Sequence, residues 1–185
     1  MTELLNPAIA RVIEVAARKG VTLDIRTFEF STHTAAEAAA AVEAELGQIV
    51  KSIVFVAPRP EGRLSPIICL VSGVNQVDLK LLAAVTGESS VRRASAREAR
   101  DLTGFSIGGI PPIGHARGTR VLMDQDLTPY QWVWASAGTE SSVFRVTPGI
   151  LRMLSNAVVA PIAAAPWVVA AMPQMPMMME AGSGA

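Results

Sequence analysis

The sequence predicts a single α+β domain in which a mixed, mostly antiparallel sheet is flanked by helices. Segments with the alternating pattern of strands are interspersed with segments that carry helix-capping signals. Several of the predicted strands are separated by turns short enough to form hairpins, which join antiparallel strands. The length of 185 residues, with 50% hydrophobic and 17% charged residues, fits one domain with its own core.

The N-terminal part is expected to form a helix and a strand. Pro7 begins a stretch with apolar residues on one helical face, and this stretch closes at Gly20. Apolar and polar residues then alternate over 21–25, which predicts a strand that continues toward Phe28 and Phe30. Thr34 and Glu37 have the spacing of a capping box, so an Ala-rich helix is expected from there through Leu46.

The middle of the chain predicts a buried hairpin. Residues 49–56 are almost all apolar, as in a strand covered on both faces, and 67–71 form a second such run after a turn at 58–66. Cys69, the single cysteine, lies inside the second run and is interpreted as a core residue. Further helices are predicted at 78–85, 95–102 and 147–154, and further strands at 120–123, 131–136 and 142–146.

The folded domain is expected to span 1–164, followed by a Met- and Pro-rich tail at 165–185. The tail has no usable periodicity, so it is either poorly ordered or packs on another subunit through its methionines. The most apolar stretch, 157–172, contains two prolines and is shorter than the ~20 residues that cross a bilayer. With no secretory signal at the N-terminus, a cytoplasmic protein is expected.

Lys51 is the first candidate functional residue, because lysine is rarely buried unless it is paired. It lies inside the apolar run 49–56, where alternation places it on the face of Ile49, Ile53 and Phe55. Its ammonium either reaches the edge of the strand or lies at the floor of a pocket, where it would meet a phosphate or a carboxylate.

The second candidate is the Gly- and Pro-rich loop at 104–114, which contains Gly108, Gly109, Ile110, Pro111 and Pro112. Glycine permits close approach of the backbone to a ligand and prolines stiffen the loop, so the loop can present fixed amides to an oxyanion. The alternative is a tight connector. The sequence contains neither a Walker loop nor a dinucleotide-binding fingerprint.

Five features occur in an order that is typical of one family: Lys51 in a strand, a helix from Asp78, the loop from Gly108 to Pro112, a strand that ends at Asp124, and a helix start at Thr147. The order resembles the YbaK/ProX family of aminoacyl-tRNA deacylases, which also occur as the editing insertion of bacterial prolyl-tRNA synthetases. The resemblance covers roughly residues 31–162. Its most specific elements are the strand lysine and the Gly-x-x-x-Pro loop.

The resemblance implies an enzyme that hydrolyses, in trans, the ester between a wrong amino acid and the 3′ end of a tRNA. Lys51 would hold the substrate end, and the amides of Gly108, Gly109 and Ile110 would orient the reacting carbonyl, with Pro112 completing the loop. The implied partner is the 3′ end of a mischarged tRNA, here of the proline type with a small amino acid, with a synthetase as a further partner. No cofactor, metal, membrane or DNA partner is expected.

Four other residues are weaker candidates for substrate binding. His33 and Thr34 would line the amino-acid pocket, although Thr34 also fits a helix cap. His115 directly follows the loop, where it is either a general base or a hydrogen-bonding residue. Asp124 matches an aspartate of the family and either faces the pocket or forms a turn.

The charged and aromatic residues indicate how strongly the chain would bind RNA. Sixteen basic and sixteen acidic residues give a net charge of zero, which excludes a strong general polyanion binder. The region from Lys51 to Arg120 nevertheless holds ten basic and five acidic residues. Trp132 and Trp134 share a strand face and are interpreted as packing residues. Two rival functions stay open: a binding module of the same fold without turnover, and a structural subunit that assembles through the tail.

Overall fold

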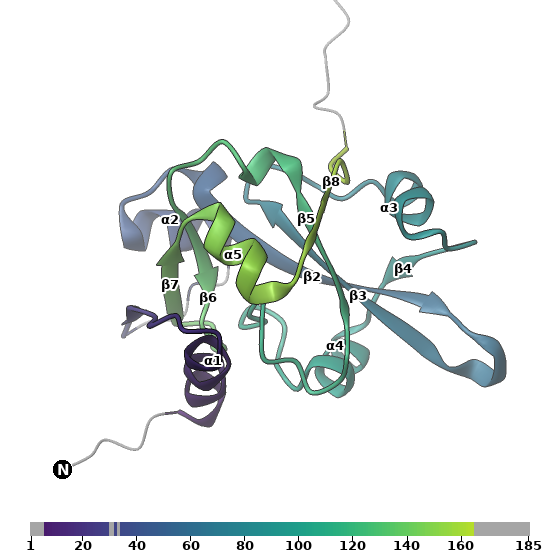
Figure 1. Cartoon of the computed structure of the whole chain (residues 1–185), viewed down its shortest axis with the longest axis horizontal. Coiled ribbons are helices and arrows are strands. Elements are labelled where there is room, and N and C mark those ends of the chain that lie inside the picture. Colours follow the sequence, from purple (N-terminus) through teal and green to yellow (C-terminus); the bar gives the residue numbers. More distant parts are fainter. Residues whose placement is uncertain (1–5, 30–31, 33, 165–185) are drawn as a thin grey trace, which may run out of the picture.

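The structure, a computed structural model, describes residues 6–29, 32 and 34–164. Within them the chain forms a mixed sheet with the strand order β1-β7-β6-β2-β3-β5-β8, and β4 pairs with β2 beside this path (Figure 1). The strands are β1 Ile25–Thr27, β2 Ile49–Pro58, β3 Leu64–Ser72, β4 Arg92–Arg93, β5 Arg120–Asp124, β6 Val133–Ser136, β7 Ser142–Val146 and β8 Val158–Ala160.

Antiparallel pairs predominate in this sheet, as the sequence predicts. The pairs β1–β7, β2–β3, β2–β4 and β6–β7 are antiparallel, whereas β2–β6, β3–β5 and β5–β8 are parallel. The longest pair is the predicted hairpin, in which β2 and β3 stay in register from Val50 opposite Ser72 to Pro58 opposite Leu64. This hairpin runs from the middle of the molecule to its right-hand end in Figure 1, and its two strands lie in the middle of the sheet order.

Five α-helices lie against the sheet in the described residues: α1 Pro7–Arg18, α2 Ala35–Val42, α3 Leu79–Thr86, α4 Ala96–Thr103 and α5 Pro148–Ser155. Their starts are those that the capping signals predict. Thr34 and Ser95 form complete capping boxes with Glu37 and Glu98. Asp78 and Thr147 accept hydrogen bonds from the first-turn amides of α3 and α5.

Three expectations for these elements need correction. Helix α2 ends at Val42 and not at Leu46, because Glu43 adopts a left-handed conformation (φ 55°) that closes the helix, and Leu46–Gln48 forms a separate 3-10 turn. Strand β1 is shorter than predicted and pairs only with β7. The short strands β4 and β8 were not predicted, and Phe30 and the tail at 165–185 lie outside the described residues.

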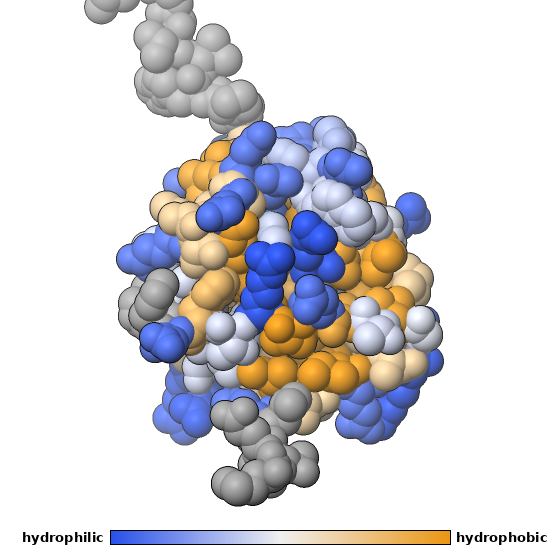
Figure 2. Space-filling view, turned by 90° about the vertical axis from the view of Figure 1, so that its left-hand side faces the viewer, coloured by the Kyte–Doolittle hydropathy of each residue, from blue (hydrophilic) through white to orange (hydrophobic). Residues whose placement is uncertain are grey.

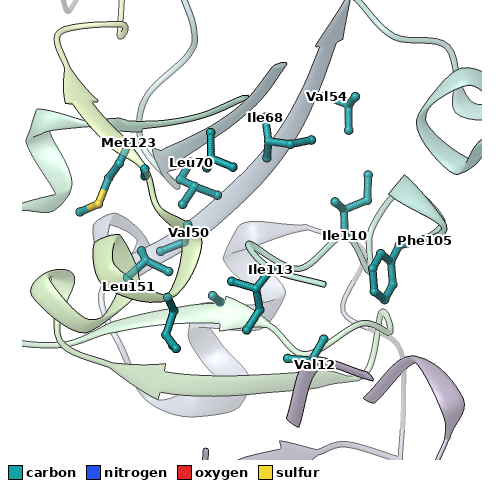
Figure 3. Packing of buried hydrophobic residues seen from close by; sticks show 14 of the residues in the cluster. Val12, Val50, Val54, Ile68, Leu70, Phe105, Ile110, Ile113, Met123 and Leu151 are labelled. Carbon is teal, nitrogen blue, oxygen red and sulfur yellow. The ribbon is translucent and has the colours of Figure 1, made fainter. Parts of the chain in front are cut away.

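The sheet is covered on both faces. The larger core cluster lies on one face, where Val50, Val54 and Val56 of β2 pack with residues of α1, α4 and α5. Figure 3 shows this cluster, including Ile110 and Ile113 of the Gly- and Pro-rich loop. Helix α3 covers part of the opposite face, and α2 covers another part of that face. The side of the molecule with α2 and β7 presents both hydrophilic and hydrophobic residues to solvent (Figure 2).

An ion-pair cluster joins three segments at one end of the hairpin. Arg59, which follows β2, donates hydrogen bonds of 2.5 and 2.6 Å to the Glu88 carboxylate. Arg120, at the start of β5, donates another to the same carboxylate. These hydrogen bonds, those of Arg59 first, lower the pKa of Glu88 to about 2. Glu88 therefore connects the hairpin, the end of α3 and β5 through charge-assisted contacts.

We expect Glu88→Gln to lower the thermal midpoint near neutral pH, because the neutral amide loses charge-assisted bonds to two arginines. The wild-type carboxylate has a lowered folded pKa, so its stabilisation is present above its ordinary pKa of 4.5 and is lost as the pH falls toward about 2. The difference between the two proteins should therefore narrow in acid. Thermal unfolding followed by circular dichroism near pH 7 and near pH 3 measures this difference in midpoint.

The control variant is Glu61→Gln, which changes a carboxylate whose side chain is 80% exposed and lies 3.6 Å from Arg63. Its midpoint should stay close to that of the wild type at both pH values. A difference for Glu88→Gln that stays constant across this range would contradict the assignment.

Candidate functional site

The candidate site lies where one edge of β2 has no paired strand. Strand β3 occupies the other edge along almost its whole length. On the open side, β6 pairs only with Ile49 and Val50, whereas β4 pairs only with Phe55 and Val56. The amide of Ala94 extends the β4 contact to the carbonyl of Val54 at 2.9 Å. The stretch from Lys51 to Ile53 is therefore left open between two diverging strands.

A cavity of about 230 Å³ fills this gap. Because side chains alternate between the faces of a strand, the cavity is lined by Lys51 and Ile53 from one face of β2 and by Ser52 from the other. Helix α2, Arg93 of β4, the Gly- and Pro-rich loop, and the segment from Trp134 to Val143 complete its walls. The cavity thus occupies the place of a missing strand, and its size suits a small ligand group.

Lys51 is half-buried, and its ammonium is already partly held. Its Nζ donates hydrogen bonds to the carbonyls of Gly73 (3.1 Å) and Asn75 (2.5 Å), both in the loop after β3. An ammonium has three N–H donors, so one remains available to a ligand. Burial lowers the pKa of Lys51, and the positive charge of Arg93 lowers it further. The structure confirms that Lys51 shares its strand face with Ile53 and Phe55.

Asp124 lies behind Lys51 and does not line the cavity. The Asn75 side chain donates 2.8 Å hydrogen bonds to the carboxylates of both Asp124 and Asp126. The carbonyl of the same Asn75 accepts the shorter bond from Lys51. Asp124 is fully buried, and this burial raises the pKa of its carboxyl. The structure therefore connects Asp124 to Lys51 through one intervening residue.

The Gly-Gly-Ile-Pro-Pro loop forms another wall of the cavity through Gly108 and Ile110. Gly108 has a φ of 93°, a conformation that side chains rarely adopt. A Cβ on Gly109 would lie 2.8 Å from the backbone of Thr139, so the loop packs closely on the turn between β6 and β7. Both glycines are therefore required by local geometry.

The three loop amides differ in their partners. The Gly109 amide donates to the Ser106 carbonyl at 3.0 Å, so it is used inside the loop. The amides of Gly108 and Ile110 form no hydrogen bond with any described part of the chain. Two of the three predicted amides are thus left for a ligand. Pro112 does not line the cavity and borders a separate hollow on the other side of the loop.

His115 lies in that separate hollow and supports the loop from behind. Its Nε2 is 2.8 Å from the Pro111 carbonyl, and its Nδ1 is 3.1 Å from the Thr119 hydroxyl. A carbonyl only accepts, so Nε2 carries the proton and the Thr119 hydroxyl donates to Nδ1. Burial lowers the pKa of His115, which favours this neutral form. The structure does not bring His115 together with Lys51.

Thr34 both caps helix α2 and lines the cavity, and these are the two positions that the sequence suggests for it. Its hydroxyl accepts a 3.1 Å hydrogen bond from the amide of Glu37 as the cap of α2, and the residue also lines the cavity. His33 lies outside the described residues. Of the predicted site residues, the structure therefore brings Lys51, Gly108, Ile110 and Thr34 to one cavity.

Sequence reasoning missed several residues of the cavity. The Ser52 hydroxyl is buried and has no hydrogen-bond partner among the described residues, and adjacency to Lys51 is the one signal that could have indicated it. Arg93, Thr139 and Glu140 reach the cavity from β4 and from the β6–β7 turn. No local pattern marks these three, because the sheet topology alone brings them to Lys51.

The remaining expectations concern Cys69, the two neighbouring tryptophans, metal binding and membrane spans. Cys69 is fully buried, and burial raises the pKa of its thiol to about 12, which confirms a core residue. Trp134 is buried as predicted, whereas Trp132 is 37% exposed because it precedes β6. Among the described residues, no group of three or more His, Cys, Asp or Glu side chains has the arrangement of a metal site. No helix in the same residues is long and apolar enough to span a membrane.

Comparisons with known proteins match most of the region just described. The family model described as "Aminoacyl-tRNA editing domain" matches residues 30–154. The uncharacterised protein YwhH of Bacillus subtilis (strain 168) is 32% identical over 132 residues, which cover 71% of this chain and 81% of YwhH. EbsC of Enterococcus faecalis, provisionally named a Cys-tRNA(Pro)/Cys-tRNA(Cys) deacylase, is 26% identical over 135 residues, 71% of this chain and 80% of EbsC.

Solved structures of other proteins are also similar to this chain over most of its length. A crystal structure provisionally described as a trans-editing enzyme for prolyl tRNA synthetase superposes with a TM-score of 0.79 and 42% identity, over 87% of this chain and 99% of that chain. The hypothetical protein APE2540 superposes with a TM-score of 0.75 and 26% identity, over 83% of this chain and 99% of that chain. The likeness in structure therefore extends over more than four fifths of this chain.

We expect Arg93→Ala to raise the pKa of Lys51, because it removes a like charge that disfavours the ammonium. The matched control is Arg93→Lys, which retains the positive charge and should leave the pKa close to that of the wild type. The pH dependence of Lys51 modification by an amine-reactive reagent, followed by peptide mass spectrometry, measures the shift. An unchanged pKa in Arg93→Ala, or an equal rise in Arg93→Lys, would contradict the electrostatic account.

Proposed function

The chain belongs to the aminoacyl-tRNA editing domain family, and on that premise we propose that it hydrolyses the ester of a mischarged aminoacyl-tRNA. The observation that carries the proposal is the cavity at the open edge of β2. There the remaining donor of Lys51 and the unused amides of Gly108 and Ile110 surround a space of about 230 Å³. These are the groups that ester hydrolysis needs to bind a substrate and polarise its carbonyl.

The chemistry requires little more than positioning. In the proposed reaction a water oxygen adds to the ester carbonyl carbon, the bond to the ribose oxygen of the terminal adenosine then breaks, and a proton of the water passes to that ribose oxygen. The amides of Gly108 and Ile110 donate to the carbonyl oxygen, where negative charge develops. The products are the free amino acid and a tRNA with a free ribose hydroxyl. An aminoacyl ester is already activated, so orientation and carbonyl polarisation supply the acceleration without a side-chain nucleophile.

Lys51 has the role of holding the substrate end. Its ammonium is fixed by two backbone carbonyls, so its remaining N–H has a defined direction. The unpaired hydroxyl of Ser52 supplies one more polar contact in the same cavity. Placing a substrate group beside this hydroxyl would satisfy a buried polar atom that the protein alone leaves unpaired.

The cavity favours a small amino acid. This preference is inferred from its limited volume of about 230 Å³ and from its apolar walls, which include Ile53, Ile107 and Ile110. A proline-type tRNA is proposed from the relatives, since EbsC is named for Cys-tRNA(Pro) and the similar solved structure for prolyl tRNA synthetase. Such a tRNA would be met in the cytoplasm, where a synthetase is a further candidate partner.

We expect Lys51→Ala to fold and to lose most of its hydrolytic activity, by at least about tenfold, because a charge-assisted contact to the substrate is removed. The assay measures release of the amino acid from tRNA charged with Ala, Ser, Thr, Cys or 2-aminobutyrate. The matched control is Lys80→Ala, since Lys80 is an exposed lysine on α3. Its rate should equal that of the wild type.

Unchanged turnover in Lys51→Ala would exclude the assigned role of Lys51. If the wild type cleaves none of the esters but binds tRNA ends, the protein is a binding module of the same fold and the proposed hydrolysis is wrong. The two results are distinguished because binding and turnover are measured separately.

A further inference from the structure

Two tryptophans and two arginines form an alternating row beside the cavity. The guanidinium of Arg26 lies 4.8 Å from the ring centroid of Trp134. The guanidinium of Arg145 lies 5.7 Å from the same ring and 4.9 Å from that of Trp132. Arg145 and Trp134 face each other across the β6–β7 pair, and Arg26 belongs to β1. We call these four residues the Trp–Arg row.

Folding alone does not account for this row. Trp134 is buried under α2, but Trp132 is 37% exposed and both arginines are exposed. Among the described residues, neither Arg26 nor Arg145 forms a salt bridge. The row therefore presents two uncompensated positive charges and an aromatic face to solvent, on the strands seen at the left of Figure 1.

Some other exposed arginines of the chain are neutralised, although Arg100, Arg117 and Arg152 are exposed and form no salt bridge within the described residues. Arg59 and Arg120 bind Glu88, and Arg92 binds Glu98 at 2.8 Å. These pairs account for part of the basic excess between Lys51 and Arg120. The arginines left without a carboxylate include Arg93, on one wall of the cavity, and the two arginines of the row, next to another wall.

The row is continuous with the cavity because Trp134 lines it. When the terminal aminoacyl-adenosine of a tRNA occupies the cavity, the unpaired nucleotides that precede it must extend away from the cavity mouth. Exposed aromatic rings that stack on bases, together with arginines that contact phosphates, are the usual means of holding single-stranded RNA. Figure 2 shows the molecule from this side, with strongly hydrophilic residues set among hydrophobic ones near the centre.

We propose that the Trp–Arg row binds the unpaired nucleotides that precede the 3′-terminal adenosine of the tRNA. Trp132 supplies the stacking surface, and Arg145 and Arg26 contact the adjoining phosphates and bases. The inference rests on the proposed function, since it assigns the RNA part of the substrate to a surface next to the same cavity. On this proposal the affinity for RNA comes from the row and not from the net charge of the protein, which is zero.

The test compares two substrates that share the ester but differ in the RNA. One is aminoacyl-tRNA and the other is the corresponding aminoacyl-adenosine, which lacks the preceding nucleotides. Trp132→Ala and Arg145→Gln should each raise KM for the tRNA by about tenfold, with kcat within about twofold. Both variants should cleave aminoacyl-adenosine as the wild type does. Trp132→Phe, which retains an aromatic ring, should recover most of the affinity for tRNA.

Arg152→Gln is the matched control, because Arg152 is an exposed arginine on α5 that forms no salt bridge within the described residues. It should leave both substrates unaffected. Arg145→Gln should also reduce the salt dependence of tRNA binding by about one phosphate contact, a change that a purely structural role would not produce. Equal losses of activity on both substrates would indicate that the row only stabilises the fold. No loss of activity on either substrate would exclude the row from RNA binding.

Direct binding separates failure of this inference from failure of the proposed hydrolysis. Fluorescence anisotropy of an uncharged RNA hairpin with an unpaired 3′ tail requires no turnover. If the wild type binds this RNA and the row variants do not, the inference holds even when no ester is cleaved. If the wild type cleaves aminoacyl-adenosine and the variants bind RNA normally, the inference is wrong and the hydrolysis stands.

Discussion

The structure depends on a constraint at one edge of β2. Backbone amides and carbonyls inside a protein need partners, so a central strand is normally paired along both edges. Here β3 pairs with one edge of β2 continuously, while β6 and β4 divide the other and leave Lys51 to Ile53 open. The β2–β3 hairpin thus supports only one side of this stretch. The cavity exists because the sheet lacks a strand at this point, and its walls are the elements that close around the gap.

The same constraint explains the support around Lys51. A half-buried ammonium needs acceptors, and the loop after β3 supplies two carbonyls. That loop is held in turn by the Asn75 amide, which binds the carboxylates of Asp124 and Asp126. On the other wall, the contact of His115 with the Pro111 carbonyl supports the glycine loop. Asp124 and His115 thus reach the surroundings of the cavity only indirectly, through Asn75 and Pro111.

Sequence patterns predicted much of the fold because its signals are local. The hairpin follows from two apolar runs, and the starts of α2 and α4 follow from capping boxes at Thr34 and Ser95. Lys51 was found because it breaks an apolar run. Strand β4 could not be predicted, since two arginines carry no periodicity and pair only because β2 offers an edge. Thr139 joins the cavity through tertiary structure, which no spacing in the sequence encodes.

We propose that the open edge of β2 receives the aminoacyl end of a tRNA. The most direct measurement is a crystal structure with an aminoacyl-adenosine analogue in which a stable amide replaces the ester. We expect the amide carbonyl oxygen of the analogue to lie within hydrogen-bond distance of the Gly108 and Ile110 amides, with the aminoacyl group beside Lys51 and Ser52. An analogue bound only in the hollow beside His115, or with its carbonyl directed away from both amides, would contradict it.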